Sequence, residues 1–183
     1  MKYISILRGI NVSGQKKIKM NDLKSLYETL GFQNVVTYIQ SGNVIFDTLF
    51  KSKTNLKARI ENAIEEKYKF HVPVEIRTNQ EIANIIKNCP YGCIDLAEDG
   101  TKILVTFLSS IPLKEKIEDV LKYVVAPEKL VIRGKDVYLY CPNGYGKSKL
   151  SNTFLEHKLG IKATTRNWKS VHKLYQLSME KEQ

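Results

Sequence analysis

The hydrophobic and polar positions of the first half of this chain predict four strands and three helices. β-Branched and aromatic residues predict strands at 2–8, 34–40, 43–47 and 72–78, and Ser41-Gly42 forms a hairpin turn between the middle two. Two helices are predicted by apolar residues at the spacing of one helix face, and a shorter helix is expected at 79–88. The apolar residues are Leu23, Leu26, Tyr27 and Leu30 in the first helix, and Leu56, Ile60, Ala63, Ile64 and Tyr68 in the second.

The second half of the chain repeats this order of elements. Strands are expected at 102–108, 129–133, 137–141 and 162–166, with a turn at Gly134-Lys135. Three helices accompany them, and the middle helix is expected to begin near Ser148. The outer two are marked by Leu113, Ile117, Val120, Leu121 and Val124, and by Trp168, Val171, Leu174 and Tyr175.

Each half therefore reads β-α-β-β-α-β followed by a trailing helix, the order of the ferredoxin-like split βαβ unit. We predict an α+β protein of two tandem ferredoxin-like units, with antiparallel sheets covered by helices. The units are expected at 1–90 and 100–183. The linker at about 90–100 is predicted from its proline, glycine and acidic residues.

Composition narrows the class of protein. Apolar residues make up 43% and charged residues 26% of the chain, a balance typical of soluble globular proteins. No apolar run approaches the roughly 18 residues that cross a bilayer, so no membrane partner is expected. Cys89 and Cys93 have no second Cys/His pair, which favours free thiols in the cytoplasm over a zinc site or a disulfide framework. We expect no metal and no cofactor.

The net charge of +10 is concentrated in two segments. Residues 8–24 carry a net +4 and residues 145–173 a net +6, so the remainder of the chain is balanced. A surface that is charged only for solvation spreads its excess more evenly. The concentration indicates an anionic partner, such as nucleic acid or a phosphorylated small molecule.

The stretch 141–155, "CPNGYGKSKLSNTFL", resembles a phosphate-binding P-loop. That motif needs a glycine where Cys141 stands, and it needs a parallel sheet, so nucleotide hydrolysis is not expected. A simpler anion site remains open, formed by flexible glycines and lysines at a helix N-terminus. Its residues would be Gly144, Tyr145, Gly146, Lys147, Ser148 and Lys149. The alternative is that Ser148 or Ser151 only caps the helix and the glycines only shape the turn.

Topology predicts which loops meet. In a ferredoxin-like unit the end of the first strand lies beside the central hairpin, which groups residues 8–17 with 40–43. Arg8, Asn11, Lys16 and Lys17 are then candidate anion ligands, or else part of a solvated basic loop. In the second half the turn at 143–149 is grouped with 164–168.

The second group contains a run of five residues with polar or stacking side chains. They are Thr164, Thr165, Arg166, Asn167 and Trp168, which combine two hydroxyls, a guanidinium, an amide and an indole. The alternative is that Asn167 caps the last helix and that Trp168 packs into the core. The core position is favoured for Trp168.

Catalytic motifs are few. His71, His157 and His172 are scattered, and no nucleophile elbow, paired carboxylates or Cys/His dyad can be identified. A site assembled in space from distant residues stays open, so the sequence leaves enzymatic activity undecided.

Three blocks, Leu7–Gly14, Thr37–Phe46 and Gly144–Leu174, resemble the bacterial domain-of-unknown-function family 1697. Its members have "LLRGINVGG"-like openings, "TYIQSGNVIF"-like hairpins and a C-terminal "GYGxSKLxNxFLExKLGxxATTRNWxTVxKL"-like block. Ser13 stands where a glycine is common, and Ser170-Val171-His172 departs slightly from the usual form. The resemblance implies a duplicated ferredoxin-like fold and brings no established activity.

The first functional hypothesis is a cytoplasmic protein that binds nucleic acid or a nucleotide. Phosphates would be contacted by Arg8, Lys16, Lys17, Lys147, Lys149 and Arg166, and a base would stack on Trp168 or Tyr145. The second is an enzyme acting on a phosphorylated or carboxylated small molecule, and the third is a protein-interaction module.

Overall fold

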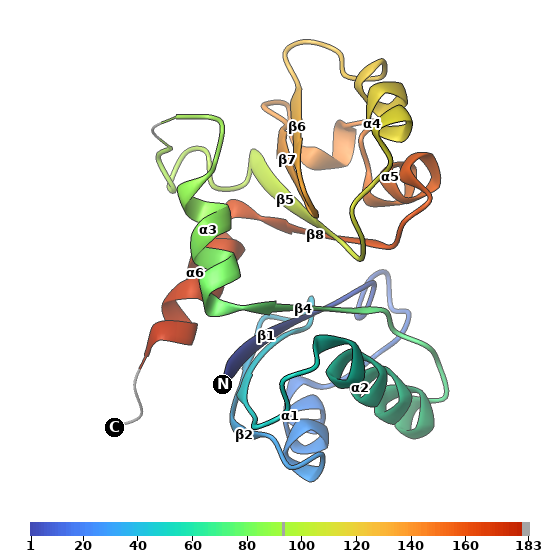
Figure 1. Ribbon diagram of the computed structural model, residues 1–183, viewed down its shortest axis with the longest axis vertical. Coiled ribbons are helices and arrows are strands. Elements are labelled where there is room, and N and C mark those ends of the chain that lie inside the picture. The colour runs from blue at the N-terminus through green and yellow to red at the C-terminus, as the bar shows by residue number, and fades with distance from the viewer. Residues whose placement is uncertain (93, 181–183) are drawn as a thin grey trace. The chain divides into compact units, whose positions relative to one another are not determined.

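Each half of the chain folds into the strands and helices that its hydrophobic pattern predicts. The computed structural model describes residues 1–92 and 94–180 (Figure 1). The first half contains β1 (Lys2–Leu7), α1 (Met20–Thr29), β2 (Gln33–Tyr38), β3 (Asn43–Asp47), α2 (Lys53–Tyr68), β4 (Val74–Thr78) and α3 (Asn79–Lys87). The second half contains β5 (Ile103–Leu108), α4 (Lys114–Leu121), β6 (Lys129–Arg133), β7 (Asp136–Tyr140), the 3₁₀ turn η1 (Tyr145–Lys147), α5 (Asn152–Leu159), β8 (Ala163–Asn167) and α6 (Trp168–Met179).

Both sheets have the ferredoxin-like strand order. The first sheet runs β2-β3-β1-β4 and the second runs β6-β7-β5-β8, and every pairing is antiparallel. β1 and β5 occupy central positions, and their almost continuous burial explains their apolar sequences. The predicted α+β fold of two tandem ferredoxin-like units is therefore confirmed.

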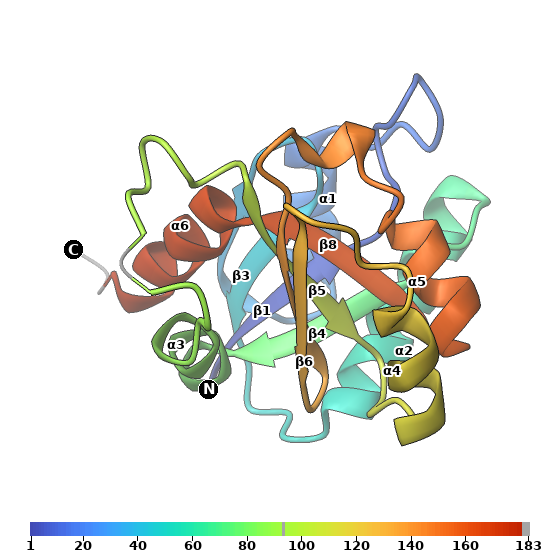
Figure 2. The same ribbon diagram turned by 90° about the horizontal axis from the view of Figure 1, so that it is seen from above.

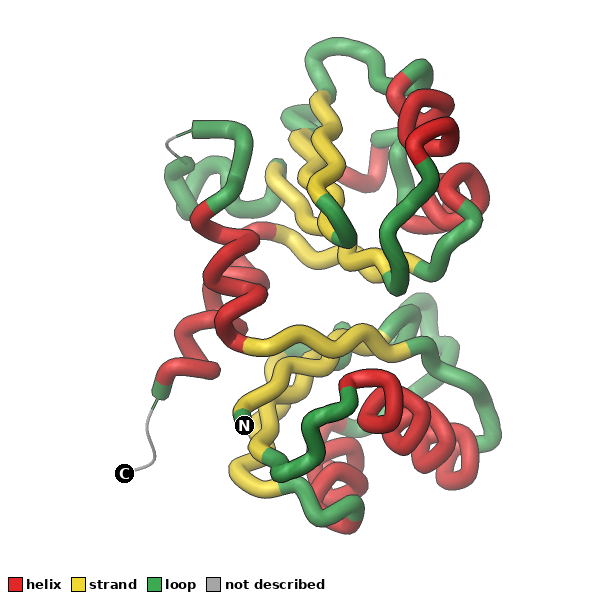
Figure 3. Tube along the Cα trace, in the orientation of Figure 1, coloured by secondary structure: helices red, strands yellow, loops and turns green. Residues whose placement is uncertain are grey.

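In each unit two helices cover one face of the sheet. In the first unit α1 and α2 lie on the same side of the strands (Figure 3), and Leu23, Tyr27 and Ile60 pack with Phe46 in the core. In the second unit α4 and α5 lie side by side (Figure 2), where Val120 and Leu155 pack with Leu104.

Two helices of the second unit differ from the sequence prediction. α5 begins at Asn152 and not near Ser148, because the Ser151 hydroxyl caps it by accepting a hydrogen bond from Phe154 N at 3.2 Å. The residues before it form the 3₁₀ turn. In α4 only Val120 is fully buried, whereas Leu113, just before the helix, and Leu121, its last residue, are exposed.

By its internal contacts the chain divides into two compact units. The first comprises Met1–Ala83 together with the chain from Leu174 onward, and the second comprises Asn84–Lys173. Both divisions fall inside helices, within α3 and within α6. The unit bounds expected from the sequence, 1–90 and 100–183 with a linker at about 90–100, stay a prediction. None of the helices described is long and apolar enough to cross a membrane.

Candidate anion-binding site

The loop that follows β1 has an unusual backbone. Between residues 9 and 16 two glycines and three other residues adopt the left-handed conformation, with φ of 55° at Asn11, 49° at Ser13 and 45° at Lys16. Such φ values are uncommon outside glycine, and Asn tolerates them best. The value at Ser13 explains why the family pattern suits a glycine at that position.

The predicted meeting of this loop with the central hairpin is confirmed. Asn11 Nδ2 donates to the carbonyl oxygen of Gln40 at 2.9 Å, and Leu7 N donates to Gly42 O at 2.8 Å. The Asn11 amide also bonds twice to the backbone of Ile18. Asn11 is therefore already engaged in fixing the loop, whatever else it contacts.

An open cavity of about 800 Å³ lies beside this loop. Lys17 and Lys19 are exposed at its lining, and neither makes an ion pair with any residue of the described chain. Lys16 points its ammonium group elsewhere, since Nζ donates to His71 O at 2.7 Å. Arg8 is half-buried. The lining is formed by Asn11, Lys17, Ile18, Lys19, Met20, Asn21, Asp22, Gln40 and Tyr68.

In the second unit the glycine-rich stretch forms a tight turn and not a P-loop. Gly144 has φ 91°, which only glycine adopts readily, and the 3₁₀ turn η1 follows it. The preceding strand β7 is antiparallel to both β5 and β6, whereas a P-loop needs a parallel sheet. The antiparallel pairing of β7 therefore explains why this stretch does not form a P-loop.

The predicted contact between this turn and β8 is also present. Tyr145 Oη donates to Thr165 Oγ1 at 3.4 Å, and Thr165 Oγ1 donates to Asn152 Oδ1 at 3.0 Å. Thr106 on β5 shares a 2.7 Å hydrogen bond with Thr165. Sequence reasoning missed Thr106 and Asn152, because an isolated threonine inside an apolar strand and an asparagine after a helix cap carry no local signal.

A second cavity, of about 500 Å³, lies beside the turn. Lys147 and Lys149 line it, both are exposed, and neither is ion-paired within the described chain. Most of the other lining residues come from the segment after α4, which no motif had indicated. The full lining is Tyr123, Val125, Ala126, Pro127, Glu128, Asn143, Lys147 and Lys149.

Four of the predicted site residues, Ser148, Arg166, Asn167 and Trp168, make contacts within the protein. Ser148 Oγ accepts from Leu150 N at 3.0 Å, and Asn167 Oδ1 caps α6 by accepting from Ser170 N at 2.9 Å. Trp168 is 2% exposed and packs edge-on to His172, so its ring faces are covered by protein. Arg166 is also buried.

Burial lowers the pKa of Arg166 to about 10, which leaves the guanidinium charged at neutral pH. Its Nη1 donates to Thr165 O at 2.9 Å. Arg77 holds the matching place in the first unit, as the penultimate residue of β4, and it is 6% exposed. Two corresponding strands thus carry a buried arginine, which favours a structural role for both.

The described residues, 1–92 and 94–180, contain no group of three His, Cys, Asp or Glu that could hold a metal ion. The candidate site therefore consists of exposed lysines at two open cavities, Lys17 and Lys19 in the first unit and Lys147 and Lys149 in the second.

Comparison with known proteins supports the fold and leaves the activity open. The family model described as "Protein of unknown function (DUF1697)" matches residues 1–138. The chain is similar to the structure of the conserved bacterial protein SP0830 from Streptococcus pneumoniae, with 25% sequence identity and a TM-score of 0.76. That similarity covers 97% of this chain and 98% of the other. No functionally curated protein matches.

Proposed function

Because the chain belongs to the DUF1697 family of proteins of unknown function, we propose a function from its own surface: it binds nucleic acid through lysine contacts to backbone phosphates. The main support for this proposal is that the whole net charge of +10 comes from two segments. Each segment contributes exposed lysines to the lining of an open cavity. Lysine ammonium groups that lack an acidic partner are suited to bind phosphate and to release its condensed counterions.

The form of the cavities supports nucleic acid as the partner. Both are open and their lysines are exposed, whereas a selective small-molecule site converges several fixed polar groups around one ligand. Contacts of this kind follow a phosphate backbone with little dependence on sequence. The proposal includes a cytoplasmic location, which the free thiols of Cys89 and Cys141 support.

A salt titration tests the proposal. Binding of fluorescently labelled single-stranded DNA and RNA should weaken log-linearly with salt concentration, with a slope of about −3 for four phosphate contacts. A variant with glutamine at Lys17, Lys19, Lys147 and Lys149 should lose most of that slope. The matched control replaces four exposed lysines outside both basic segments, Lys51, Lys87, Lys114 and Lys116, and should bind nearly as the wild type does. The proposal would be overturned if the protein did not bind at low salt, or if both variants lost the same amount of the salt slope.

A further inference from the structure

The cavity of the second unit has two chemically different walls. One wall is the segment from Tyr123 to Pro127, which follows α4 and presents apolar surface. Val125 is 66% exposed there, and Tyr123 is 40% exposed. The other wall carries Lys147 and Lys149. A cavity lined both by apolar side chains and by two lysines is complementary to a ligand with a flat apolar part and an anionic part.

The apolar wall is fixed before any ligand arrives. Lys158 Nζ donates to the Tyr123 hydroxyl at 2.7 Å, and the same ammonium lies 4.2 Å from the Tyr123 ring centroid. The Phe154 ring packs edge-on against Tyr123, with 5.2 Å between the centroids. The segment then turns back on itself, since Glu128 N donates to Val125 O at 3.0 Å. Because the wall is already ordered, little conformational entropy is lost when a ligand binds, which favours affinity.

The cationic wall is held by the glycine turn. Lys147 N donates to Gly144 O at 3.1 Å, and Ser148 N donates to Tyr145 O at 3.1 Å. The turn fixes the backbone while the ammonium groups stay in solvent. Glu128 is the acidic residue of the lining, so the two lysines leave it with a net positive charge. The Glu128 carboxylate lies next to Pro127 in sequence and can accept a hydrogen bond from an N–H donor.

We propose that this cavity binds a nucleoside phosphate, with the base against the wall from Tyr123 to Pro127 and the phosphate between Lys147 and Lys149. The cavity volume of about 500 Å³ suits one such unit. A free nucleotide and one nucleotide of a single strand offer the same chemistry. The inference rests on the proposed nucleic-acid binding and adds to it a site that recognises the base.

Abasic oligonucleotides separate the inference from the proposed function. An ordinary single-stranded 10-mer and a fully abasic 10-mer carry the same phosphates, so backbone contacts alone bind both equally. We expect the ordinary strand to bind about tenfold more tightly, since burying the apolar face of one base against the wall contributes about that order. Equal, salt-dependent binding of both strands overturns the inference and leaves the proposed function standing. Failure of both strands to bind at low salt overturns both.

Two variants locate the base contact and the phosphate contact. Val125→Ser should lower the affinity for the ordinary strand to within about twofold of that for the abasic strand. Its control is Ile111→Ser, also 66% exposed but outside the cavity.

Joint replacement of Lys147 and Lys149 by glutamine should lower the salt slope by about 1.4 for both strands. Lys162→Gln, an exposed lysine of the same basic segment away from the cavity, is the charge control. Equal effects of a variant and its control overturn the assignment.

Free nucleotides distinguish the source of the ligand. Protection of the Lys147 and Lys149 amines from acylation, read by mass spectrometry, should appear with millimolar nucleoside monophosphate and not with equal inorganic phosphate. Protection by the oligonucleotide alone identifies a nucleotide within a strand as the ligand. Equal protection by inorganic phosphate shows that the base is not recognised, and it overturns the inference.

Discussion

Asn11 and Ile18 hold each other across the base of the first basic loop by two hydrogen bonds. Asn11 Nδ2 donates to Ile18 O at 2.9 Å, and Ile18 N donates to Asn11 Oδ1 at 2.8 Å. The same amide reaches Gln40 O in the hairpin, so one side chain joins three segments of backbone. Ile18 is buried in the core, and the loop is therefore anchored to the sheet that carries it.

Asn11→Ala should destabilise the first unit by about 2 kcal/mol. The substitution leaves backbone groups of Ile18 and Gln40 without their partner, and it places alanine at a φ of 55°. Urea unfolding followed by circular dichroism measures the change. Asn11→Gly keeps the backbone conformation and loses only the hydrogen bonds, so it should fall between the alanine variant and the wild type. An alanine variant as stable as the wild type would show that the amide contacts contribute nothing.

Gly42→Ala should be far more damaging than Gly31→Ala, although both glycines have φ of +80°. A Cβ at Gly42 would lie 2.5 Å from Ile10 Cδ1 and 3.0 Å from Leu7 Cβ, whereas nothing lies within 4 Å at Gly31. Because both positions have the same φ, the backbone strain of the two alanine variants is similar. The difference between their losses of stability therefore measures the steric clash at Gly42. We expect a loss of about 1 kcal/mol at Gly31 and about 3 kcal/mol at Gly42. Equal losses in thermal unfolding would contradict a close approach of the hairpin and the loop.

The sequence was sufficient for the fold because its periodic pattern occurs twice. Central strands such as β1 and β5 are buried on both faces, so their apolar runs are unambiguous. Topology then predicted correctly that the loop after β1 meets the hairpin and that the glycine turn meets β8. Helix starts were harder to predict. Ser148 and Ser151 are both plausible caps, and only the backbone of the preceding turn decides between them.

The candidate site was less predictable, because residue type does not report burial. Arg166 read as a candidate ligand in "TTRNW", yet its side chain is buried, whereas the burial of Trp168 agrees with the core position favoured for it. The apolar wall at Tyr123 to Pro127 went unnoticed, since its cavity is formed with lysines from a distant part of the chain. Residues that are distant in the chain and meet only in the folded structure have no characteristic spacing, so no sequence motif reveals them.

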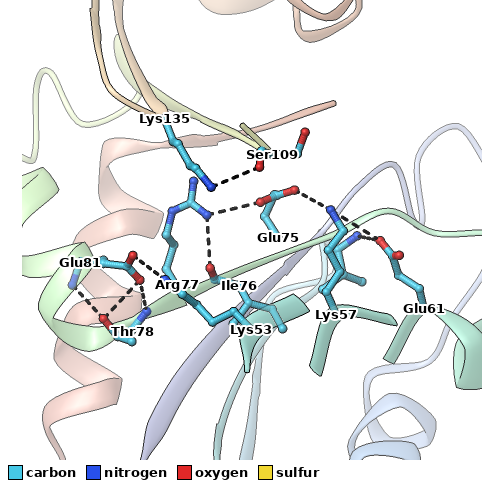
Figure 4. A network of polar contacts seen from close by, with 11 residues as sticks. Lys53, Lys57, Glu61, Glu75, Ile76, Arg77, Thr78, Glu81, Ser109 and Lys135 are labelled. Atoms are coloured by element: carbon cyan, nitrogen blue, oxygen red, sulfur yellow. Dashed lines mark hydrogen bonds and ion pairs between the residues drawn. The ribbon is translucent and has the colours of Figure 1, made fainter. Parts of the chain in front are cut away.

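The carboxylate of Glu75 neutralises buried Arg77 in the first unit (Figure 4). Glu75 Oε2 accepts from Arg77 Nη1 at 3.3 Å, and Glu75 Oε1 accepts from Lys57 Nζ at 2.9 Å. Glu75 and Arg77 are 8% and 6% exposed. Glu75→Leu should cost about 3 kcal/mol, because it leaves the buried guanidinium without this carboxylate.

Adding Arg77→Met to Glu75→Leu should recover most of that loss, since the buried charge is then removed as well. Lys57→Met is the control at the other end of the network. It should cost less than about 1 kcal/mol, because the Lys57 side chain is 30% exposed and water can replace its partner. Urea titrations of the three variants give the values. A double variant no more stable than Glu75→Leu would contradict charge neutralisation as the role of Glu75.

Glu81 should make the stability of the first unit depend on pH. It forms a capping box at the start of α3, where Thr78 N donates to Glu81 Oε2 at 2.8 Å and Glu81 N donates to Thr78 Oγ1 at 3.2 Å. Lys53 Nζ donates to Oε1 at 2.6 Å (Figure 4). Burial acts to raise the pKa of Glu81, but the hydrogen bonds from Lys53 and Thr78 outweigh it and hold the pKa below its usual value of 4.5.

The sign of the effect follows from that lowered pKa. The folded state favours the carboxylate, so Glu81 contributes stability above the pKa of the unfolded chain and loses it as pH falls through the folded pKa. Glu81→Gln should lower the free energy of unfolding by about 1 kcal/mol at pH 7, and the difference from the wild type should shrink as pH falls below 4.5. Urea unfolding at several pH values measures it, with Glu66→Gln, exposed on α2, as the control that should change little. A Glu81→Gln difference that stays constant down to pH 3 would mean that the carboxylate charge has no part in capping α3.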